Sequence, residues 1–368
     1  MPHNHPNNGV KTDIDLTNLW GAKRMKPVLR SLFSLLAICF GHSSSVTADE
    51  VQDFYRSHNV NIVIGHEPGS GFDVYGRALA RHMGRHLPGN PSFIPQNMVG
   101  AVGLNAANWT YNLAPKDGTV ISIFAHTVLL EPLLGTGAGK FDANSFNWIG
   151  NMDQVVGICG VSSRLGVGSY DELLRREVLF GSSGVGAAGP LSQFPLALKN
   201  LTGAKIKMIQ GYKGSAEIRL AMTRGEVDGI CGLPISTLKT EWRSELQTNS
   251  FKMLLQLGLE KNSELLDVPL VYDYAKDIED RYVFDLIFGI QAVGRIFVAP
   301  PGTPANRVSA LQAAFMKTMS DQEFLADAAK MDLNLKPSSG EEARLLVKRF
   351  YASPKAAIDR AKEAIKAN

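Results

Sequence analysis

Several short glycine- and serine-rich segments in this chain have the residue types and spacing to bind a small anion. Each follows a predicted strand and directly precedes a predicted helix. The first turn of a helix carries unpaired N–H groups and a partial positive charge, and glycine lets the backbone approach a bound group closely. Backbone amides could therefore hold a carboxylate without a dominant arginine. These segments are residues 69–71, 100–103, 182–184 and 211–214.

The same segments also have a purely structural interpretation, because parallel α/β proteins need tight turns at many strand ends. Phe72 and Tyr212 adjoin two of the loops, where an aromatic ring could cover a ligand or join the core. Asp73 stands at the start of the first helix, where a carboxylate caps the helix or stabilises its dipole. We favour that structural role for Asp73 over direct contact with a ligand.

Residues 184–189 give the strongest signal for a different function. Their sequence, Gly-Val-Gly-Ala-Ala-Gly, matches the dinucleotide-binding pattern G-x-G-x-x-G just after a strand. The acidic residue that binds the ribose hydroxyl is expected about 20 positions later and is missing. Pro190 follows the motif directly. A secreted, nucleotide-using α/β enzyme is therefore kept as an alternative, but we expect no cofactor.

Two further groupings are too incomplete to predict metal binding or covalent catalysis. His82 and His86 are four residues apart on a predicted helix, but no third zinc ligand is evident nearby and a solvated helix face explains them better. Ser182, Ser183 and His126 could combine as nucleophile and base, but no residue is evident that would orient the histidine. The pattern G-x-S-x-G does not occur in the sequence. We therefore expect no metal site and no catalytic residue.

Strands and helices alternate along the chain, which predicts an α/β fold with largely parallel sheets. A serine with glutamate three positions later predicts helix starts at Ser169, Ser320 and Ser339, and Thr303 followed by proline predicts another. Pro354 separates the last two predicted helices. The predicted strands are residues 60–65, 93–99, 120–125, 146–161 with a break at 151–153, 178–180, 206–209, 227–231 and 284–299.

The composition is that of a globular protein without the basic surface that nucleic acid requires. Of the 368 residues, 45% are hydrophobic and 20% are charged, so a buried core is expected. The formal net charge of +3 arises in residues 1–48, which carry five basic and two acidic residues and leave 33 of each for the rest. This neutral body argues against nucleic-acid binding.

Residues 1–48 are typical of a secretory signal peptide with a short preceding segment. A basic segment precedes the apolar stretch 31–41, which is shorter than the roughly 20 residues that a membrane span needs. Residues 46–48, Val-Thr-Ala, form a small-residue cleavage site, so the mature protein would begin at Asp49. Met25 is an alternative start. We therefore expect export to the periplasm.

The predicted mature chain has two cysteines, Cys159 and Cys231, each within the local sequence Gly-Ile-Cys-Gly. An oxidising compartment permits a disulfide between them. Two small buried strand residues are the alternative, and the sequence leaves both open. Lipid attachment at Cys39 is less favoured, because Ile38 stands where such sites have a small residue.

The order of these motifs resembles that of the substrate-binding proteins of tripartite tricarboxylate transporters. Residues 60–73, VNIVIGHEPGSGFD, are similar to the family's opening strand and P-G-G-x-x-D loop. Residues 97–103, NMVGAVG, are similar to its N-x-x-G-A-G-G segment. The resemblance covers residues 58–355 and continues at 115–119, 180–186, 212–216, 225–228 and 298–304.

The resemblance implies a two-lobed periplasmic-binding-protein fold of type II, in which each lobe is a mainly parallel sheet flanked by helices. The first lobe would combine residues 49–153 and 285–335, and the second would be residues 154–284, with the C-terminal helices of 336–368 unassigned. Such proteins catalyse nothing. They capture a small carboxylate, a di- or tricarboxylate or an aromatic acid, and deliver it to a permease with a large and a small membrane subunit. We expect a monomer.

In that family, backbone amides and small side chains of both lobes hold the carboxylate, in agreement with the glycine loops. The chain departs from the family at Ser70 and Gly71, and its Glu67 and His126 also adjoin the predicted loops, so the ligand is left open. A sensor that docks on a membrane signalling partner is a further alternative. The predicted ligand-binding residues are Gly69, Ser70, Gly71, Phe72, Asp73, Ala101, His126, Thr127, Ser182, Ser183, Gly184 and Tyr212.

Overall fold

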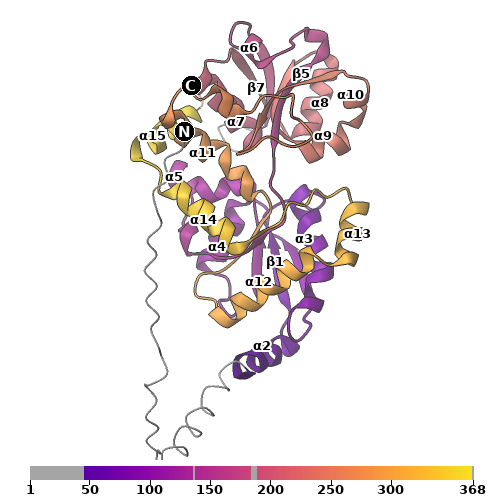
Figure 1. Ribbon diagram of the computed structural model, residues 1–368, viewed down its shortest axis with the longest axis vertical. Coiled ribbons are helices and arrows are strands. Elements are labelled where there is room, and N and C mark those ends of the chain that lie inside the picture. The colour runs from indigo at the N-terminus through magenta and orange to yellow at the C-terminus, as the bar shows by residue number, and fades with distance from the viewer. Residues whose placement is uncertain (1–44, 136, 184–188, 367–368) are drawn as a thin grey trace, which may run out of the picture. The chain divides into compact units, whose positions relative to one another are not determined.

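The computed structural model describes residues 45–135, 137–183 and 189–366. The chain forms two units, Met1–Asp49 and Glu50–Asn368, and the fold below is that of the second unit. It contains two sheets with helices on both faces of each (Figure 1). Among the described residues, no helix combines the length and the apolar composition that crossing a membrane requires.

The first sheet has six strands in the order β11-β4-β10-β3-β1-β2. β1 is parallel to β2 and β3, whereas β10 is antiparallel to β3 and β4, and β11 is antiparallel to β4. β1, β2, β3 and β4 thus run in one direction, as expected for a mainly parallel sheet. The strands are β1 (Val60–Ile64), β2 (Phe93–Asn97), β3 (Val120–Ile123), β4 (Asn147–Asn151), β10 (Ile296–Ala299) and β11 (Ser338–Ser339).

The helices of the first sheet present apolar faces to a core built from its β-branched strands. Ile62 and Ile64 of β1 are fully buried with Leu79 of α3 and with Leu311 and Phe315 of α12. α13 packs on α3, and α14 packs on β4 and β11. These helices are α2 (Ser45–Ser57), α3 (Gly71–His82), α4 (Leu104–Asn112), α5 (Glu131–Leu134), α12 (Ala305–Met319), α13 (Gln322–Lys330) and α14 (Gly340–Tyr351).

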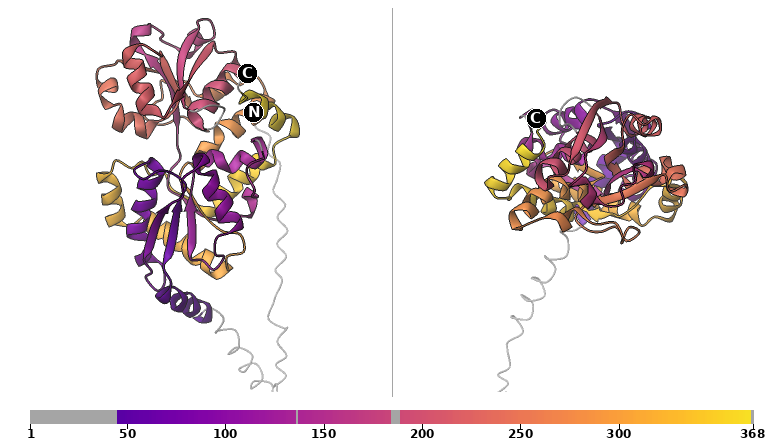
Figure 2. Two further views of the ribbon diagram at one scale, coloured as in Figure 1. Left: turned by 180° about the vertical axis from the view of Figure 1, so that it is seen from behind. Right: turned by 90° about the horizontal axis from the view of Figure 1, so that it is seen from above.

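The second sheet has five strands in the order β7-β6-β8-β5-β9. β6 is parallel to β7 and β8, and β5 is antiparallel to β8 and β9. Figure 1 and Figure 2 both show the segment that links β4 of the first sheet to β5 of the second. The strands are β5 (Gly157–Ser162), β6 (Val178–Ser183), β7 (Ile206–Tyr212), β8 (Gly229–Pro234) and β9 (Phe251–Leu257).

Two apolar cores cover the faces of the second sheet. Ile218, Ile230 and Trp242 belong to one, and the other includes Phe180 and Phe284. α15 packs against α11 and α7, so the last helix of the chain lies with this sheet. The helices are α6 (Tyr170–Leu173), α7 (Pro190–Thr202), α8 (Ser215–Arg224), α9 (Ile235–Glu241), α10 (Arg243–Gln247), α11 (Ile278–Ile287) and α15 (Lys355–Ala364).

The predicted return strand over residues 284–299 is wrong in its first part. α11 continues to Ile287 and the 3₁₀ helix η7 spans Gly289–Val293, so only Ile296–Ala299 form the strand β10. Nearly every apolar residue of this stretch is buried, as in Phe284, Phe288 and Val293. A continuous apolar run carries no period that would separate a buried helix from a buried strand, which explains the error.

Three of the four predicted helix starts are shifted or uncapped. Ser339 accepts from the backbone N–H of Glu342 in a complete capping box, as predicted. The helix predicted at Ser320 instead has Asp321 as its N-cap. Ser169 precedes α6 but caps no backbone N–H. The helix predicted at Thr303 begins at Ala305 with Pro304 in the N-cap position, because the Thr303 hydroxyl donates to the carbonyl of Pro300 instead.

Candidate functional site

The carboxyl ends of the parallel strands in both sheets lie where the chain crosses between the sheets. β5 begins beside Pro234, the last residue of β8, and β10 begins beside Asn151, the last residue of β4. The first crossing, residues 152–156, therefore runs from the carboxyl end of β4 to that of β8, and the second, residues 288–295, runs from the end of α11 to the carboxyl end of β4. In open α/β sheets ligands bind outside the carboxyl ends of the strands. Loops from both sheets can thus contribute to one site.

The loop after β1 is fixed by the carboxylate of Asp73. The Asp73 Oδ2 atom accepts from the backbone N–H of Gly69 at 2.8 Å, and Asp73 also accepts from Arg77 Nε at 2.9 Å and Asn97 Nδ2 at 2.8 Å. Arg77 and these other donors hold the pKa of Asp73 below its usual value, although burial opposes them. Ser70 is the N-cap of α3 and accepts from the Asp73 N–H. Asp73 thus positions the loop, and its oxygens are already engaged.

Arg295 lies at the same edge and is the most unusual charged residue of the region. It immediately precedes β10 and is only 7% exposed. Its guanidinium carbon lies 4.4 Å from the ring centre of Phe72 and 4.9 Å from that of Tyr75. Nη1 donates to the Gly294 carbonyl at 3.0 Å, whereas Nε is buried without a partner. Within the described ranges, no carboxylate lies at ion-pair distance from this arginine.

Two histidines next to Arg295 are held in the neutral state. Burial, and to a smaller extent the charge of Arg295, lowers the pKa of His66 to about 4 and the pKa of His126 to about 3. The Gly294 carbonyl opposes the shift of the His126 pKa. The His66 ring stacks on Phe72 with centroids 4.0 Å apart. Nδ1 of His66 and both ring nitrogens of His126 are buried with no hydrogen bond of good geometry.

Asp153, on the first crossing, faces the same cluster without pairing directly with Arg295. Asn334 Nδ2 donates to its Oδ1 at 2.6 Å, and the Tyr75 hydroxyl donates to the Asn334 carbonyl at 2.7 Å. Burial raises the pKa of Asp153 to about 7, although Arg295 opposes this shift. The cluster therefore contains one permanent charge, that of Arg295, among groups that are neutral or partly protonated at pH 7.

Glycine brings the loops of the first sheet close together. A Cβ on Gly103 would lie 2.8 Å from the Cβ of Phe124, and one on Gly65 would lie 2.9 Å from the Gly103 Cα. Gly103 also has φ of +95°, which disfavours other residues. The close approach and the positive φ both require glycine here.

Gly103→Ala is therefore expected to lower the free energy of unfolding by about 1–3 kcal/mol. Urea denaturation followed by circular dichroism measures this change. Gly168→Ala is a matched control, because a Cβ there would make only an ordinary contact, 3.5 Å from Glu172 Oε1. An equal effect of the two substitutions would contradict the close packing at Gly103.

The second sheet contributes small polar residues at its own carboxyl edge. Ser182 is fully buried near the end of β6, and its hydroxyl hydrogen-bonds that of Ser192 on α7 at 2.8 Å. Tyr212 is the last residue of β7 and is partly buried, so the predicted loop at 211–214 begins inside this strand. Ser215 begins α8 directly after this loop. The helix-start amides of α8 and α9 therefore lie at the edge where the crossings meet the sheet.

No known family model and no curated protein matches the sequence. The structure, however, is similar to a TctC solute-binding protein from Polaromonas, with a TM-score of 0.64 and 19% identity over 84% of this chain and 99% of that one. The chain has the fold of the TctC-type solute-binding proteins. The periplasmic binding protein BugD gives a TM-score of 0.60 at 19% identity, covering 85% of this chain and 99% of its own. MatC from Rhodopseudomonas palustris, with malate bound, gives 0.59 at 16% identity, covering 84% and 99%.

Within this TctC fold the predicted site residues of the first sheet gather at one edge. Gly69 to Asp73 follow β1, Ala101 follows β2 in the 3₁₀ helix η2 (Ala101–Gly103), and His126 and Thr127 follow β3 in η3 (His126–Leu130). In the second sheet Ser182, Ser183 and Tyr212 end strands β6 and β7. Gly184 and most of the G-x-G-x-x-G motif lie outside the described residues.

Sequence reasoning missed the charged centre of this edge of the TctC fold. Arg295 is the one charged residue in the largely apolar stretch 286–299, and that isolation was the available signal. Charged residues are seldom buried without a partner or a function. Asp153 is similarly isolated between two buried strands.

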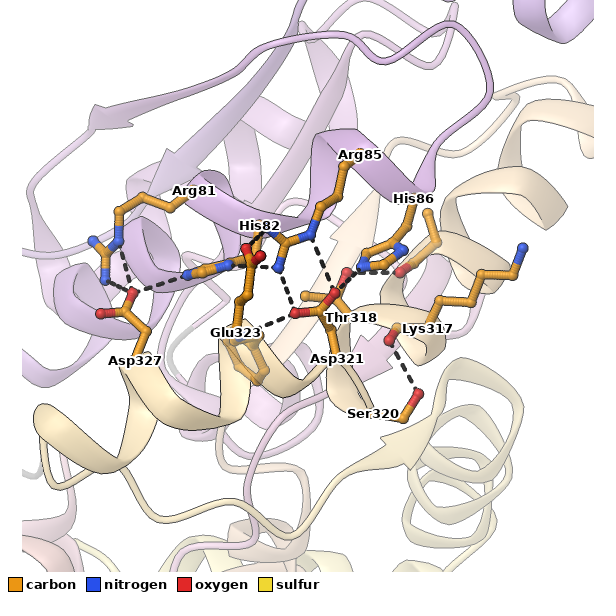
Figure 3. A network of polar contacts seen from close by, with 12 residues as sticks. Arg81, His82, Arg85, His86, Lys317, Thr318, Ser320, Asp321, Glu323 and Asp327 are labelled. Atoms are coloured by element: carbon orange, nitrogen blue, oxygen red, sulfur yellow. Dashed lines mark hydrogen bonds and ion pairs between the residues drawn. The ribbon is translucent and has the colours of Figure 1, made fainter.

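His82 and His86 belong to an ion-pair network that joins α3 and the 3₁₀ helix η1 (Met83–His86) to α13 (Figure 3). Nε2 of His82 lies 2.9 Å from Asp327, and Nε2 of His86 lies 2.9 Å from Asp321. Arg85 lies between them and hydrogen-bonds both His82 and Asp321. The prediction of a solvated helix face is wrong for His82, which is only 9% exposed because α13 covers it. The network attaches α13 to the first sheet of the TctC fold.

A cavity of about 340 Å³ lies between α9 and the segment that follows α13. Lys239 and Arg243 line one side, and Asp332 and Asn334 line the other. Arg243 Nη2 is 3.8 Å from Asp332 Oδ2 across it. Asn334 also bonds Asp153, so the cavity shares a wall residue with the polar cluster around Arg295.

Proposed function

We propose that this protein is an extracytoplasmic solute-binding protein that closes over a small carboxylate and delivers it to a tripartite tricarboxylate-type permease. The carrying observation is that both sheets direct their carboxyl edges toward the crossings between them. The structural similarity to proteins with malate and adipate bound supports a carboxylate as the ligand class. The two crossings would act as the hinge for closure.

In this function each of the two sheets forms one lobe and contributes one side of the binding site. Residues 49–153 and 285–335 form the first lobe and residues 154–284 the second, with α15 docked on the second. Helix-start amides at Ser70 and Ser215, with the small residues near the end of β6, hold the carboxylate from opposite sides. Residues 1–48 direct export and are removed, and the mature protein acts as a monomer without catalysis. Its membrane partners are a large and a small permease subunit.

Isothermal calorimetry tests the binding role. The mature protein, purified and refolded to remove any ligand, is titrated with malate, adipate, citrate and benzoate, and at least one is expected to bind with micromolar or tighter affinity. Mass spectrometry of small molecules released from the untreated protein identifies the natural ligand independently. Absence of binding by all four acids, together with no acid released, would contradict the proposal.

A further inference from the structure

Arg295 differs from Arg307, a partly buried arginine of the first sheet, in what surrounds it. Arg307 also lies over an aromatic ring, Phe54, at 3.5 Å and also has a buried Nε without a partner. Arg307, however, lies at the amino end of β3, because its Nη1 donates to the carbonyl of Asp117 just before that strand. Arg295 lies at the opposite, carboxyl end, beside the predicted loops. Two arginines with similar contacts thus occupy opposite edges of one sheet.

The backbone and the neighbouring rings hold the Arg295 guanidinium in one place. The Arg295 N–H donates to Asn151 Oδ1 at 2.9 Å, and its carbonyl accepts from the Met152 N–H at 3.0 Å. Phe72 and Tyr75 lie against the guanidinium. Nη2 lies 3.3 Å from the position that a Cβ on Gly71 would take, so the glycine loop directly borders the charge. The group is therefore preorganised and adjoins the loop that we assign to the ligand.

The hydrogen-bonding capacity around Arg295 is largely unused. A guanidinium has five N–H donors, and within the described part of the chain only Nη1 has an acceptor, the Gly294 carbonyl. His126 is 4% exposed, and neither of its ring nitrogens has a hydrogen bond of good geometry; His66 has a buried Nδ1 without such a bond. Buried polar groups and charges without partners are costly, and such sites commonly await a ligand. The missing partner must accept hydrogen bonds and carry negative charge.

We propose that Arg295 binds a carboxylate group of the ligand directly, with His66 and His126 completing the polar wall of the first lobe. A planar guanidinium pairs with a carboxylate through two parallel hydrogen bonds, which defines the orientation of the bound group. This inference rests on the proposed function and adds to it a charged contact from the first lobe. The expected ligands are acids that place a carboxylate in the first lobe, opposite the helix-start amides of the second lobe.

Arg295→Gln and a change in the ligand together test the contact. The probe is whichever of malate, adipate, citrate and benzoate binds the wild type most tightly, compared with analogues in which one carboxylate is a primary amide. Charged hydrogen bonds of this kind correspond to roughly 10- to 100-fold in affinity. The affinity of the wild type is expected to fall by that factor when one of the amide analogues replaces the acid. Arg295→Gln is expected to bind the acid and that analogue with about equal affinity. This double comparison isolates the pair from other effects of each change.

Arg307→Gln is the matched control, because it also removes an arginine from an aromatic ring but at the far edge of the sheet. It is expected to leave the affinity for the probe unchanged. Arg295→Lys keeps the charge without the planar fork and is expected to bind with intermediate affinity. Circular dichroism and thermal melts establish that each variant is folded.

The possible failures are distinguishable. If the wild type binds an acid but Arg295→Gln binds it equally well, the Arg295 contact is wrong and the proposed function stands. If the wild type binds the acid and every amide analogue equally, the contact is also wrong, even where the variant fails to fold. If the wild type binds none of the four acids and no acid is released from the untreated protein, both the proposed function and this contact fail.

Discussion

Removing the disulfide between Cys159 and Cys231 is expected to lower the free energy of unfolding by about 4 kcal/mol in the chain-entropy treatment of a loop this long. The two cysteines are 72 positions apart and are cross-strand neighbours on β5 and β8. The structure joins them as a disulfide. Both are buried, at 1% and 0% exposed, so the bond lies within the second sheet and is shielded from solvent. The larger the loop that a bond closes, the more it restricts the unfolded chain.

Urea unfolding of the Cys159→Ala, Cys231→Ala double variant against the wild type measures the effect. Reductant is expected to destabilise the wild type and to leave the double variant unchanged, which controls for any other action of the reagent. Alkylation of the unfolded, unreduced protein followed by mass spectrometry counts the free thiols. Two free thiols in the exported protein would show that the cysteines are only small buried strand residues.

Most strands up to residue 234 could be predicted because they are bounded by local signals, but β9 (Phe251–Leu257) was not predicted. The strand at 60–64 is β-branched and ends at Gly65, and the box at Ser339 and Glu342 begins α14 as predicted. Local signals fail where an element is buried on all sides, because its sequence then shows no hydrophobic period. The residues from Leu286 to Val293 are largely buried and, apart from Gln291, apolar, so helix and strand have the same pattern there. Which strands lie antiparallel depends on the two crossings, and no local pattern specifies those.

The loops of the candidate site could be predicted, but the charge at its centre could not. Glycine and an N-cap serine specify the turn at Gly69 and Ser70 through backbone geometry, which is visible in the sequence. Phe72 lies more than 200 positions before Arg295 in the chain, and the two come together only because β10 lies antiparallel beside β3. Its position beside Phe72 therefore depends on sheet order, a tertiary property. The hydrogen bond from the Gly69 N–H to Asp73 was within reach of the sequence, because a carboxylate in the first turn of a helix acts on residues close to it in the chain.

Between pH 4.5 and 6, the three buried groups around Arg295 are expected to make the protein more stable as pH rises. In this range the unfolded chain has both His66 and His126 largely protonated and Asp153 ionised, from ordinary pKa values of about 6.5 and 3.9. The folded protein has pKa values of about 4 for His66, about 3 for His126 and about 7 for Asp153. It therefore binds one proton on Asp153, whereas the unfolded chain binds two on the histidines.

The unfolded chain thus binds one more proton, so the free energy of unfolding should rise by about 1.4 kcal/mol per pH unit. Above pH 6 the histidines of the unfolded chain and Asp153 of the folded protein both lose their protons, so the difference in bound protons falls to about zero at pH 7 and stability levels off. Urea midpoints measured from pH 4.5 to 7.5 record the rise and the plateau. The slope disappears near neutrality because the carboxyl and the imidazoles are buried against the same guanidinium and respond to pH in opposite directions.

Two substitutions should change the acidic slope in opposite directions. His66→Gln removes one proton from the unfolded chain and should make stability nearly independent of pH between 4.5 and 6. Asp153→Asn removes the opposing proton from the folded protein and should steepen the slope to about 2.7 kcal/mol per pH unit. Both variants keep a hydrogen-bonding side chain of similar size, so each serves as the control for the other. A common slope for all three proteins would mean that these groups titrate as they do in the unfolded chain, and that the surroundings of Arg295 are open to water.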